Sequence, residues 1–171
     1  MEGKGRITGH TGLLALIGSP VGHSGSPAMY NYSFERLGLD YAYVAFDIKI
    51  EEVKAALDAM RLFHMRGCNV TMPCKTEAAK YMDELSPAAR IIGAVNTIVN
   101  EDGKLIGHMT DGEGFVGNLR DHGIEIKGKK ITVAGGGGAA TAIQVQCALD
   151  GAREISIFNI KDDFFARTLE T

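Results

Sequence analysis

The chain has 171 residues, of which 45% are hydrophobic and 23% are charged, and its formal net charge at pH 7 is -3. These values are typical of a globular protein with one domain or two small ones. They argue against a nucleic-acid-binding module, which would usually show a basic face, because the lysines and arginines are scattered singly along the chain.

The longest apolar run, GLLALIG at residues 12–18, is far shorter than the roughly 20 residues of a membrane span, and no leader cleavage site follows it. We therefore expect a cytoplasmic protein with no membrane partner. The three cysteines (Cys68, Cys74 and Cys147) form no CxxC pair. This pattern argues against a disulfide framework and against a zinc site, so we expect no bound metal.

In chain order, short apolar stretches alternate with helical patterns. Strands are predicted at residues 13–18, 41–48, 67–72, 94–99, 104–109, 130–135 and 154–160. Helices are predicted at residues 26–38, 51–64, 74–85, 111–123 and 137–151, the first of them capped by Ser26 with Pro27 at its first position. This alternation indicates an α/β fold with a largely parallel sheet. NEDG at residues 100–103 predicts a hairpin between two of the strands.

A domain boundary is expected near residues 110–128, where the polar segment IEIKGKK precedes a new strand and helix. We therefore divide the chain into a first domain at 1–110 and a second at 111–171. The second has only two strand patterns, whereas a complete doubly wound sheet has about six strands. Apolar edges at such a break would need cover from another chain, for example in a homodimer.

The second domain carries a glycine-rich motif. Gly135, Gly137 and Ala140 fit the spacing G-x-G-x-x-A, directly after an apolar strand and at the start of a helix. In this setting glycines let backbone N–H groups approach a pyrophosphate, which the helix N-terminus stabilises. The alternative is a turn that is merely flexible. The strand–loop–helix context favours nucleotide binding.

The next predicted strand ends in FNIKDDFF, residues 158–165, about where a Rossmann domain contacts the adenosine ribose. Asp162 and Asp163 are candidate acceptors for the ribose 2'-hydroxyl, and Lys161 is the cation nearby. Alternatively, one aspartate caps the following helix. Carboxylates without an arginine favour NAD over NADP.

Polar side chains gather where the predicted strands of the first domain end or in the adjoining loops. They are Ser24, Ser26, Thr71, Lys75, Asn96 and Asp111. Ligands of open α/β sheets bind outside the carboxyl ends of the strands. Each residue also has an ordinary structural interpretation, such as a helix cap or a satisfied buried amide. Together they predict a polar pocket that binds the neutral hydroxyl groups of a ligand. The helix macrodipole disfavours a lysine where Lys75 stands, which is a further reason to suspect function there.

Several segments together resemble a known family. IGSPVGHSGSP, NVTMPCK, GAVNT, TDGEGF and GGGGAAT, in this order and spacing, resemble the shikimate dehydrogenase family. RGCNVTMPCK, DELSPAA and FNIKDDFF most resemble its quinate/shikimate dehydrogenase branch. The resemblance implies an N-terminal substrate-binding domain followed by the start of a Rossmann-type NAD(P)-binding domain. It also implies an oxidoreductase that reversibly reduces 3-dehydroshikimate to shikimate in aromatic amino acid (chorismate) biosynthesis, with quinate as a further candidate substrate.

The resemblance also implies roles for individual residues. Ser24 and Ser26 match the serines that hold the substrate carboxylate, and Thr71, Asn96 and Asp111 match residues that hold ring hydroxyls. Lys75 and Asp111 match the catalytic pair. Gly135, Gly137, Gly138 and Ala139 match the pyrophosphate loop, and Asn159, Lys161 and Asp162 match the adenosine-ribose segment. Ile160 stands where NADP-specific members carry an arginine, which supports dual or NAD-leaning cofactor use.

Two features depart from the family pattern. Met109 stands where the family usually has the asparagine of NTDG, and family members continue well beyond the position that matches Thr171. A rival interpretation is therefore a truncated module that binds substrate or nucleotide without turnover. A dehydrogenase of the methylene-tetrahydrofolate type fits the lysine and the glycine motif, but it leaves Ser24 and Ser26 unexplained.

For Lys75, two roles stay open: a proton-transferring acid/base, or a permanent ammonium that polarises the reacting oxygen.

Overall fold

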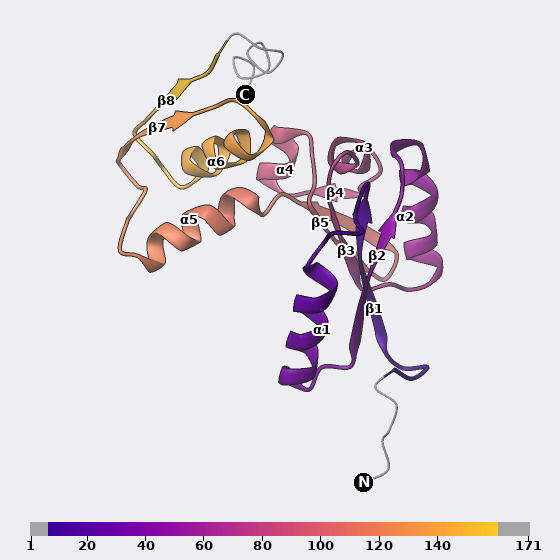
Figure 1. Cartoon of the computed structure of the whole chain (residues 1–171). Helices are drawn as coiled ribbons and strands as arrows, with labels where there is room; N and C mark the ends of the chain where they lie inside the picture. Colours follow the sequence, from indigo (N-terminus) through magenta and orange to yellow (C-terminus); the bar gives the residue numbers. More distant parts are fainter. Residues whose placement is uncertain (1–6, 161–171) are drawn as a thin grey trace. The chain divides into compact units, whose positions relative to one another are not determined.

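A computed structural model of the chain describes residues 7–160 (Figure 1). Its strands are β1 (Gly12–Gly18), β2 (Tyr41–Asp47), β3 (Gly67–Val70), β4 (Glu84–Leu85), β5 (Thr97–Glu101), β6 (Lys104–His108), β7 (Lys130–Ala134) and β8 (Glu154–Phe158). Its helices are α1 (Ser26–Leu37), the 3-10 turn η1 (Ile50–Glu52), α2 (Val53–Leu62), α3 (Lys75–Ala79), α4 (Pro87–Ile92), α5 (Asp111–Asp121) and α6 (Gly138–Leu149). No helix within this part of the chain is long and apolar enough to cross a membrane.

The chain forms two compact units that are interleaved in sequence. The first contains the described residues up to Glu84 and returns for Val95–Gly107. The second contains Leu85–Ala94 and the described residues from His108 onward. The short helix α4 therefore belongs to the second unit, although residues of the first unit flank it on both sides in the sequence.

The first unit is built on a six-stranded sheet in the order β2-β1-β3-β5-β6-β4. β1 pairs in parallel with β2 and with β3, whereas β5 pairs antiparallel with β3. The predicted α/β class is confirmed. The predicted hairpin is confirmed as well: the turn between β5 and β6 consists of Asp102 and Gly103, both with positive φ, as a two-residue hairpin turn requires.

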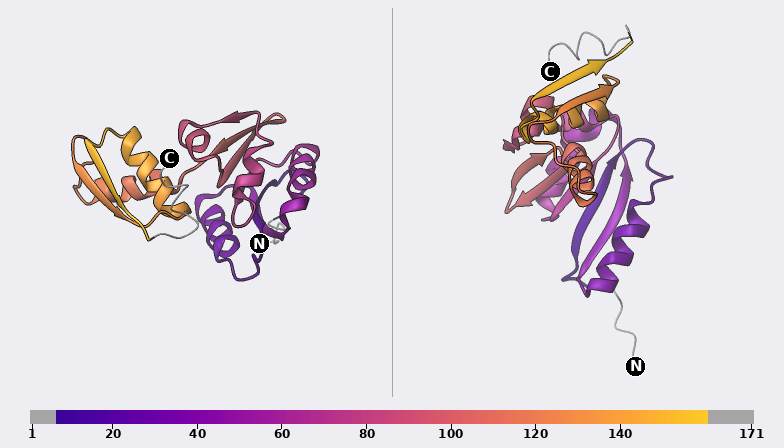
Figure 2. Two further views of the ribbon diagram at one scale, coloured as in Figure 1. Left: turned by 90° about the horizontal axis from the view of Figure 1, so that it is seen from above. Right: turned by 90° about the vertical axis from the view of Figure 1, so that its left-hand side faces the viewer.

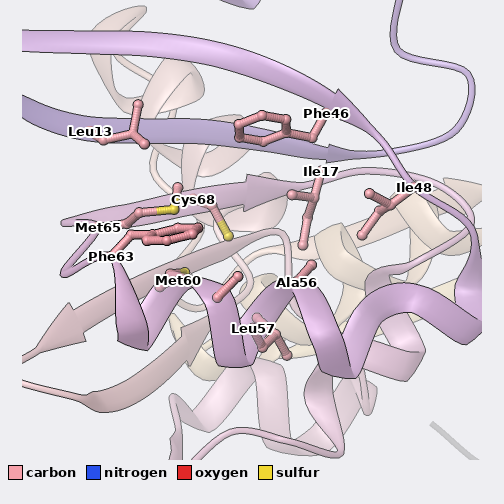
Figure 3. A pocket seen from close by; sticks show the side chains of 11 residues that line it. Leu13, Ile17, Phe46, Ile48, Ala56, Leu57, Met60, Phe63, Met65 and Cys68 are labelled. Carbon is pink, nitrogen blue, oxygen red and sulfur yellow. The ribbon is translucent and has the colours of Figure 1, made fainter.

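The two faces of this sheet carry different helices, because side chains alternate along each strand. On one face, Leu16 and Tyr43 pack with Phe34 of α1. On the other face, Ile17 and Cys68 point toward Leu57 and Met60 of α2, as Figure 3 shows. The result is a helix on each side of the strands.

Two sequence-based expectations were wrong in this unit. The helix predicted at 74–85 stops at Ala79, because the chain then pairs with β6: the Asp83 N–H donates to the Leu105 carbonyl (2.9 Å), and β4 follows. This tertiary pairing overrides local helix propensity. Ser26 is not the cap of α1 but its first residue. The N-cap is Gly25, which has no side chain to accept the hydrogen bond that a capping serine would.

The second unit contains β7 and β8, which pair in parallel, and the helices α4, α5 and α6 (Figure 2). Its core cluster consists of Val116 from α5, Cys147 from α6 and Ile126 from the connection to β7. Helix α6 packs against α5, α4 and both strands. α4 begins at Ser86, whose side-chain oxygen accepts from the Ala89 N–H (3.3 Å).

Candidate functional site

The predicted site residues of the first unit lie where β3 ends and just before β5 begins. The Val70 N–H donates to the Asn96 carbonyl (2.8 Å), and the Val95 N–H donates to the Lys75 carbonyl (3.0 Å). Because β5 runs antiparallel to β3, Asn96 at its start lies beside the carboxyl end of β3. The Thr71 N–H donates to Ile17 at the end of β1 (2.9 Å). The fold therefore brings Thr71, Lys75 and Asn96 to one edge of the sheet.

Ser24 lies in the loop that follows β1, and Ser26 is the first residue of α1. The Ser24 N–H donates to the Val21 carbonyl (3.0 Å), which closes a tight turn, and the Ser24 side-chain oxygen accepts from the Ser26 N–H (3.2 Å). Both serines are half-buried. The first hydroxyl therefore orders the start of α1, and each remains partly open to a ligand.

Lys75 is the first residue of α3, and that helix has only five residues. The macrodipole of one short turn is weak, so the penalty expected for a cation at the start of a long helix is smaller than the sequence suggested. The preceding Cys74 is fully buried, and burial raises the pKa of its thiol, with Glu51 adding to the effect. Cys74 therefore packs in the core, whereas Lys75 is half-buried.

Asn69, which lies inside β3, was not among the predicted site residues. Its side-chain oxygen accepts from the Tyr43 hydroxyl (2.8 Å), and its Nδ2 donates to the Thr97 hydroxyl (3.2 Å) and to the Asn96 carbonyl (3.5 Å). A signal was present, since Asn69 is the single polar side chain in the strand GCNV. Its partners, however, are distant in sequence and were not predictable.

Asp111 belongs to the second unit, where it opens α5. Its exposed carboxylate, with Glu113 in the same first turn, suits the positive end of that helix. The preceding Met109, which replaces the asparagine of the family motif, is buried at 6% exposure. Asp111 therefore has an ordinary structural role in its own unit, in addition to the role that the resemblance implies.

The glycine-rich loop of the second unit connects β7 to α6. Gly135 adopts a φ of 117°, and Gly137 is the N-cap of α6. A Cβ placed on Gly137 or Gly138 would meet no atom within 4 Å, so packing within the described chain does not explain these glycines. Two side chains of α6 hold the loop from behind: Gln144 donates to the Gly135 carbonyl (3.2 Å) and Thr141 to the Gly136 carbonyl (3.4 Å).

This geometry fits a pyrophosphate-binding loop. Backbone N–H groups at the start of a helix have no partner within the helix, and open space beside the glycines admits an anion. Gly138 and Ala139 are the first two residues of α6 and lie exposed. Asn159 follows β8 and is half-buried, whereas Ile160 is exposed. Lys161 and Asp162 lie outside the described residues.

A separate cavity of about 310 Å³ lies between α2 and the sheet (Figure 3). Its lining includes Leu13, Phe46, Phe63 and Met65 and contains no charged or hydroxyl-bearing side chain. Such a cavity does not suit a polyhydroxylated ligand. The polar edge described above is therefore the candidate site. Within residues 7–160, no group of three or more His, Cys, Asp or Glu residues is placed to hold a metal ion.

Part of the first unit matches a known protein family. Residues 16–98 match the family described as the shikimate dehydrogenase substrate binding domain. Residues 16–98 are thus similar to the substrate-binding domain of shikimate dehydrogenases. The match covers Ser24, Ser26, Thr71, Lys75 and Asn96 and stops before Asp111.

Curated relatives in the shikimate dehydrogenase family carry the name shikimate dehydrogenase (NADP(+)). The protein from Listeria monocytogenes is 55% identical over 166 residues, which cover 97% of this chain and 57% of that protein. The protein from Streptococcus uberis is 52% identical over 168 residues, with the same coverage of 97% and 57%. The chain thus spans 57% of the length of these curated relatives.

Solved structures show the same similarity. Shikimate 5-dehydrogenase from Listeria monocytogenes, solved in complex with shikimate and NAD, matches with a TM-score of 0.94 at 55% identity, over 97% of this chain and 57% of that one. The ligand-free 5-ketofructose reductase of Gluconobacter sp. strain CHM43 matches with a TM-score of 0.89 at 32% identity, over 94% and 58%. The same fold therefore occurs in reductases that are named for different substrates.

Proposed function

We propose that the protein is an NAD(P)-dependent shikimate dehydrogenase, which reversibly reduces 3-dehydroshikimate to shikimate on the route to chorismate and the aromatic amino acids. The observation that carries this proposal is the meeting of Thr71, Lys75 and Asn96 at one sheet edge, within the segment that matches the family's substrate-binding domain. The Listeria monocytogenes structure with shikimate and NAD supports the choice of ligands. The proposed division by function is a substrate domain at 1–110 and a nucleotide domain at 111–171, although the compact units are interleaved and residues Leu85–Ala94 belong to the second.

The proposed substrate contacts follow the chemistry of each side chain. The hydroxyls of Ser24 and Ser26 hold the carboxylate of shikimate, because each O–H is a donor that an ionised carboxylate accepts. Thr71, Asn96 and Asp111 hold ring hydroxyls, since each side chain offers an oxygen that can accept from a hydroxyl donor. The half-buried positions of the first four side chains support this assignment, because they are accessible yet held in place.

Lys75 and Asp111 form the proposed catalytic pair. When the alcohol is oxidised, a proton must leave the hydroxyl oxygen as hydride leaves the carbon. Lys75 either accepts that proton or remains an ammonium group that orients and polarises the oxygen. The dependence of the oxidation rate on pH separates the two roles. If Lys75 accepts the proton, the fall in rate toward low pH disappears in Lys75→Met. If Lys75 is a fixed ammonium, the variant keeps that fall and has a lower rate at every pH.

The nicotinamide nucleotide supplies the hydride acceptor when it is bound. We propose that Gly135, Gly137, Gly138 and Ala139 hold its pyrophosphate and that Asn159, Lys161 and Asp162 face its ribose. The curated relatives are named for NADP(+), and one solved relative contains NAD. We propose that this chain uses both and leans toward NAD, because Ile160 offers no cation for a 2'-phosphate.

The test measures binding and turnover on the same chain. Isothermal titration with shikimate, and separately with quinate, is followed by NAD+ and NADP+ reduction at saturating substrate. We expect shikimate-dependent reduction that falls at least about 100-fold in Lys75→Met and stays near the parent rate in Lys80→Met, an exposed lysine on the same segment. Parental turnover in Lys75→Met would overturn the proposed role of that lysine.

Two other outcomes revise the proposal as a whole. Shikimate binding without turnover means that this chain is a binding module, whereas no binding of either acid refutes the substrate assignment. We also propose that the protein is cytoplasmic and that it forms a homodimer. Sedimentation of the purified chain at several concentrations tests the homodimer.

A further inference from the structure

Tyr43 connects the two sides of the proposed substrate site. It lies on β2, is 3% exposed, and stacks on Tyr30 of α1 with ring centroids 4.5 Å apart. Its hydroxyl donates to the Asn69 side-chain oxygen (2.8 Å) on β3. Through Asn69 it reaches the Asn96 carbonyl and the Thr97 hydroxyl, which are separated from Tyr43 by two other strands of the sheet.

The main chain of Tyr43 is held equally firmly. Asn31 of α1 accepts from the Tyr43 N–H (3.0 Å) and donates to the Tyr43 carbonyl (2.7 Å), and it also donates to the Pro27 carbonyl in the first turn of α1 (2.8 Å). The residue therefore joins the helix that begins at Ser26 to the strand end that carries Asn96. These are two of the places from which shikimate is proposed to be bound.

The Asn96 carbonyl and the Tyr43 hydroxyl together hold the Asn69 carboxamide in one orientation. With Tyr43 donating, the Asn69 oxygen faces the phenol and its Nδ2 faces the Asn96 carbonyl. A reversed amide would set two acceptor oxygens against each other at Asn96. Burial raises the pKa of the Tyr43 phenol well above its ordinary value, with smaller contributions from Tyr30 and Cys68. The phenol therefore keeps its proton and remains a donor.

We infer that Tyr43 is a positioning residue for the proposed shikimate site: its hydroxyl fixes the Asn69 carboxamide, which in turn holds Asn96 and Thr97 in the arrangement that binds the ligand. This inference rests on the proposed function. Tyr43 itself makes none of the proposed substrate contacts. It acts through Asn69, and a phenylalanine in its place would leave the oxygen of the half-buried Asn69 without this donor.

The test compares Tyr43→Phe with Tyr30→Phe. Both changes remove one hydroxyl from the same stacked pair, but the Tyr30 hydroxyl makes no hydrogen bond within residues 7–160. Nitrogen-15 NMR titration with shikimate, at a temperature where all variants are folded, reports affinity and local change together. We expect Tyr43→Phe to raise the Kd for shikimate about tenfold and to shift the backbone amides of Asn96 and Thr97, with neither change in Tyr30→Phe.

A double-mutant cycle separates positioning from general stability. If Tyr43 acts through Asn69, then Tyr43→Phe has no further effect on the Kd once Asn69→Ala is present. An unchanged Kd in Tyr43→Phe, or additive effects in the double variant, would overturn the inference and leave the proposed function intact. If the parent chain fails to bind shikimate, the proposed function fails. In that case the backbone amide chemical shifts of the ligand-free chain still test the role of Tyr43. If the amides of Asn96 and Thr97 do not shift in Tyr43→Phe, the inference is overturned as well.

Discussion

The backbone of Gly112 lies against the main-chain carbonyl of Ala142, so that a Cβ at position 112 would overlap that carbonyl. The same Cβ would come within 2.7 Å of the Gln146 Cβ. Gly112 follows Asp111 in the first turn of α5, and Ala142 lies in α6. The close approach of these two helices therefore requires a glycine directly beside a proposed catalytic residue.

Gly112→Ala is expected to destabilise the protein by about 1–3 kcal/mol, because the helices must move apart or their side chains leave their preferred rotamers. Urea unfolding measures the change. The matched control is Gly117→Ala in the same helix, where a Cβ would meet nothing within 4 Å. That variant should gain about 0.5–1 kcal/mol, since alanine is the better helix former. Equal stabilities for the two variants would contradict this account of the helix contact.

Asn31→Ala is expected to destabilise the protein by about 2–4 kcal/mol. The side chain of Asn31 satisfies both the N–H and the carbonyl of Tyr43 on the outer edge of β2, as a neighbouring strand would do. Removing it leaves two main-chain groups without these partners. Chemical unfolding measures the stability of Asn31→Ala, with Ser33→Ala as the control. The Ser33 hydroxyl donates to the Met29 carbonyl of its own helix. A loss no larger than that of Ser33→Ala would refute the proposed role of Asn31.

Ser86→Ala is expected to lower stability by about 1 kcal/mol through loss of the N-cap of α4. The Ser86 oxygen accepts from the Ala89 N–H, and Pro87 follows in the first turn. Ser86→Asp keeps an acceptor at the same place and should retain most of the stability. The midpoint of thermal unfolding of the two variants provides the comparison, and a larger loss in Ser86→Asp would show that the cap is not the cause.

Asp83 should contribute a pH-dependent part of the stability. The Leu105 N–H donates to its carboxylate (2.7 Å), and with Arg61 as the second cause this lowers the pKa of Asp83 below its ordinary 3.8. A lowered folded-state pKa stabilises the protein above the unfolded pKa, and the contribution is lost as the pH falls through the folded pKa. Asp83→Asn should therefore melt at a lower temperature than the parent at about pH 7, and the gap should close as the pH falls through the folded pKa of Asp83.

Asp58→Asn is the control for that pH effect. Asp58 is exposed and pairs with Lys54 one helical turn away, a kind of surface ion pair that contributes little. We expect its melting temperature to stay near that of the parent across the same range. A gap for Asp83→Asn that widens as the pH falls would show that the sign of the argument is wrong.

Local signals made several parts of the fold predictable. The turn at Asp102 and Gly103 was found because these residue types favour positive φ, which the structure shows at both positions. The helix predicted to continue to residue 85 was wrong because β4 depends on a pairing with β6 that no local pattern reveals. The helix α4 was missed although Ser86 and Pro87 repeat the serine–proline signal that was used at Ser26 and Pro27.

The location of the candidate site was predictable from the sequence, whereas the hydrogen bonds that hold its residues in place were not. Thr71, Lys75 and Asn96 were expected near strand ends, and the structure brings them to one edge. The antiparallel direction of β5, which puts Asn96 there, was not foreseen as the reason. Tyr43 and Asn69 are 26 residues apart in sequence, and such a hydrogen bond between distant side chains leaves no local trace. The roles of the site residues stay predictions that the experiments above test.

The interleaving of the two units limits how the gene can be divided. The chain enters the second unit at Leu85, leaves it after Ala94 and enters it again at His108, so no single cut yields one intact unit. A fragment ending at residue 110 would retain α4 without α6 and would expose the apolar side chains of Ala88, Ala89 and Ile92. A soluble first unit therefore calls for a designed linker from Glu84 to Val95 and a terminus at Gly107, rather than a simple truncation.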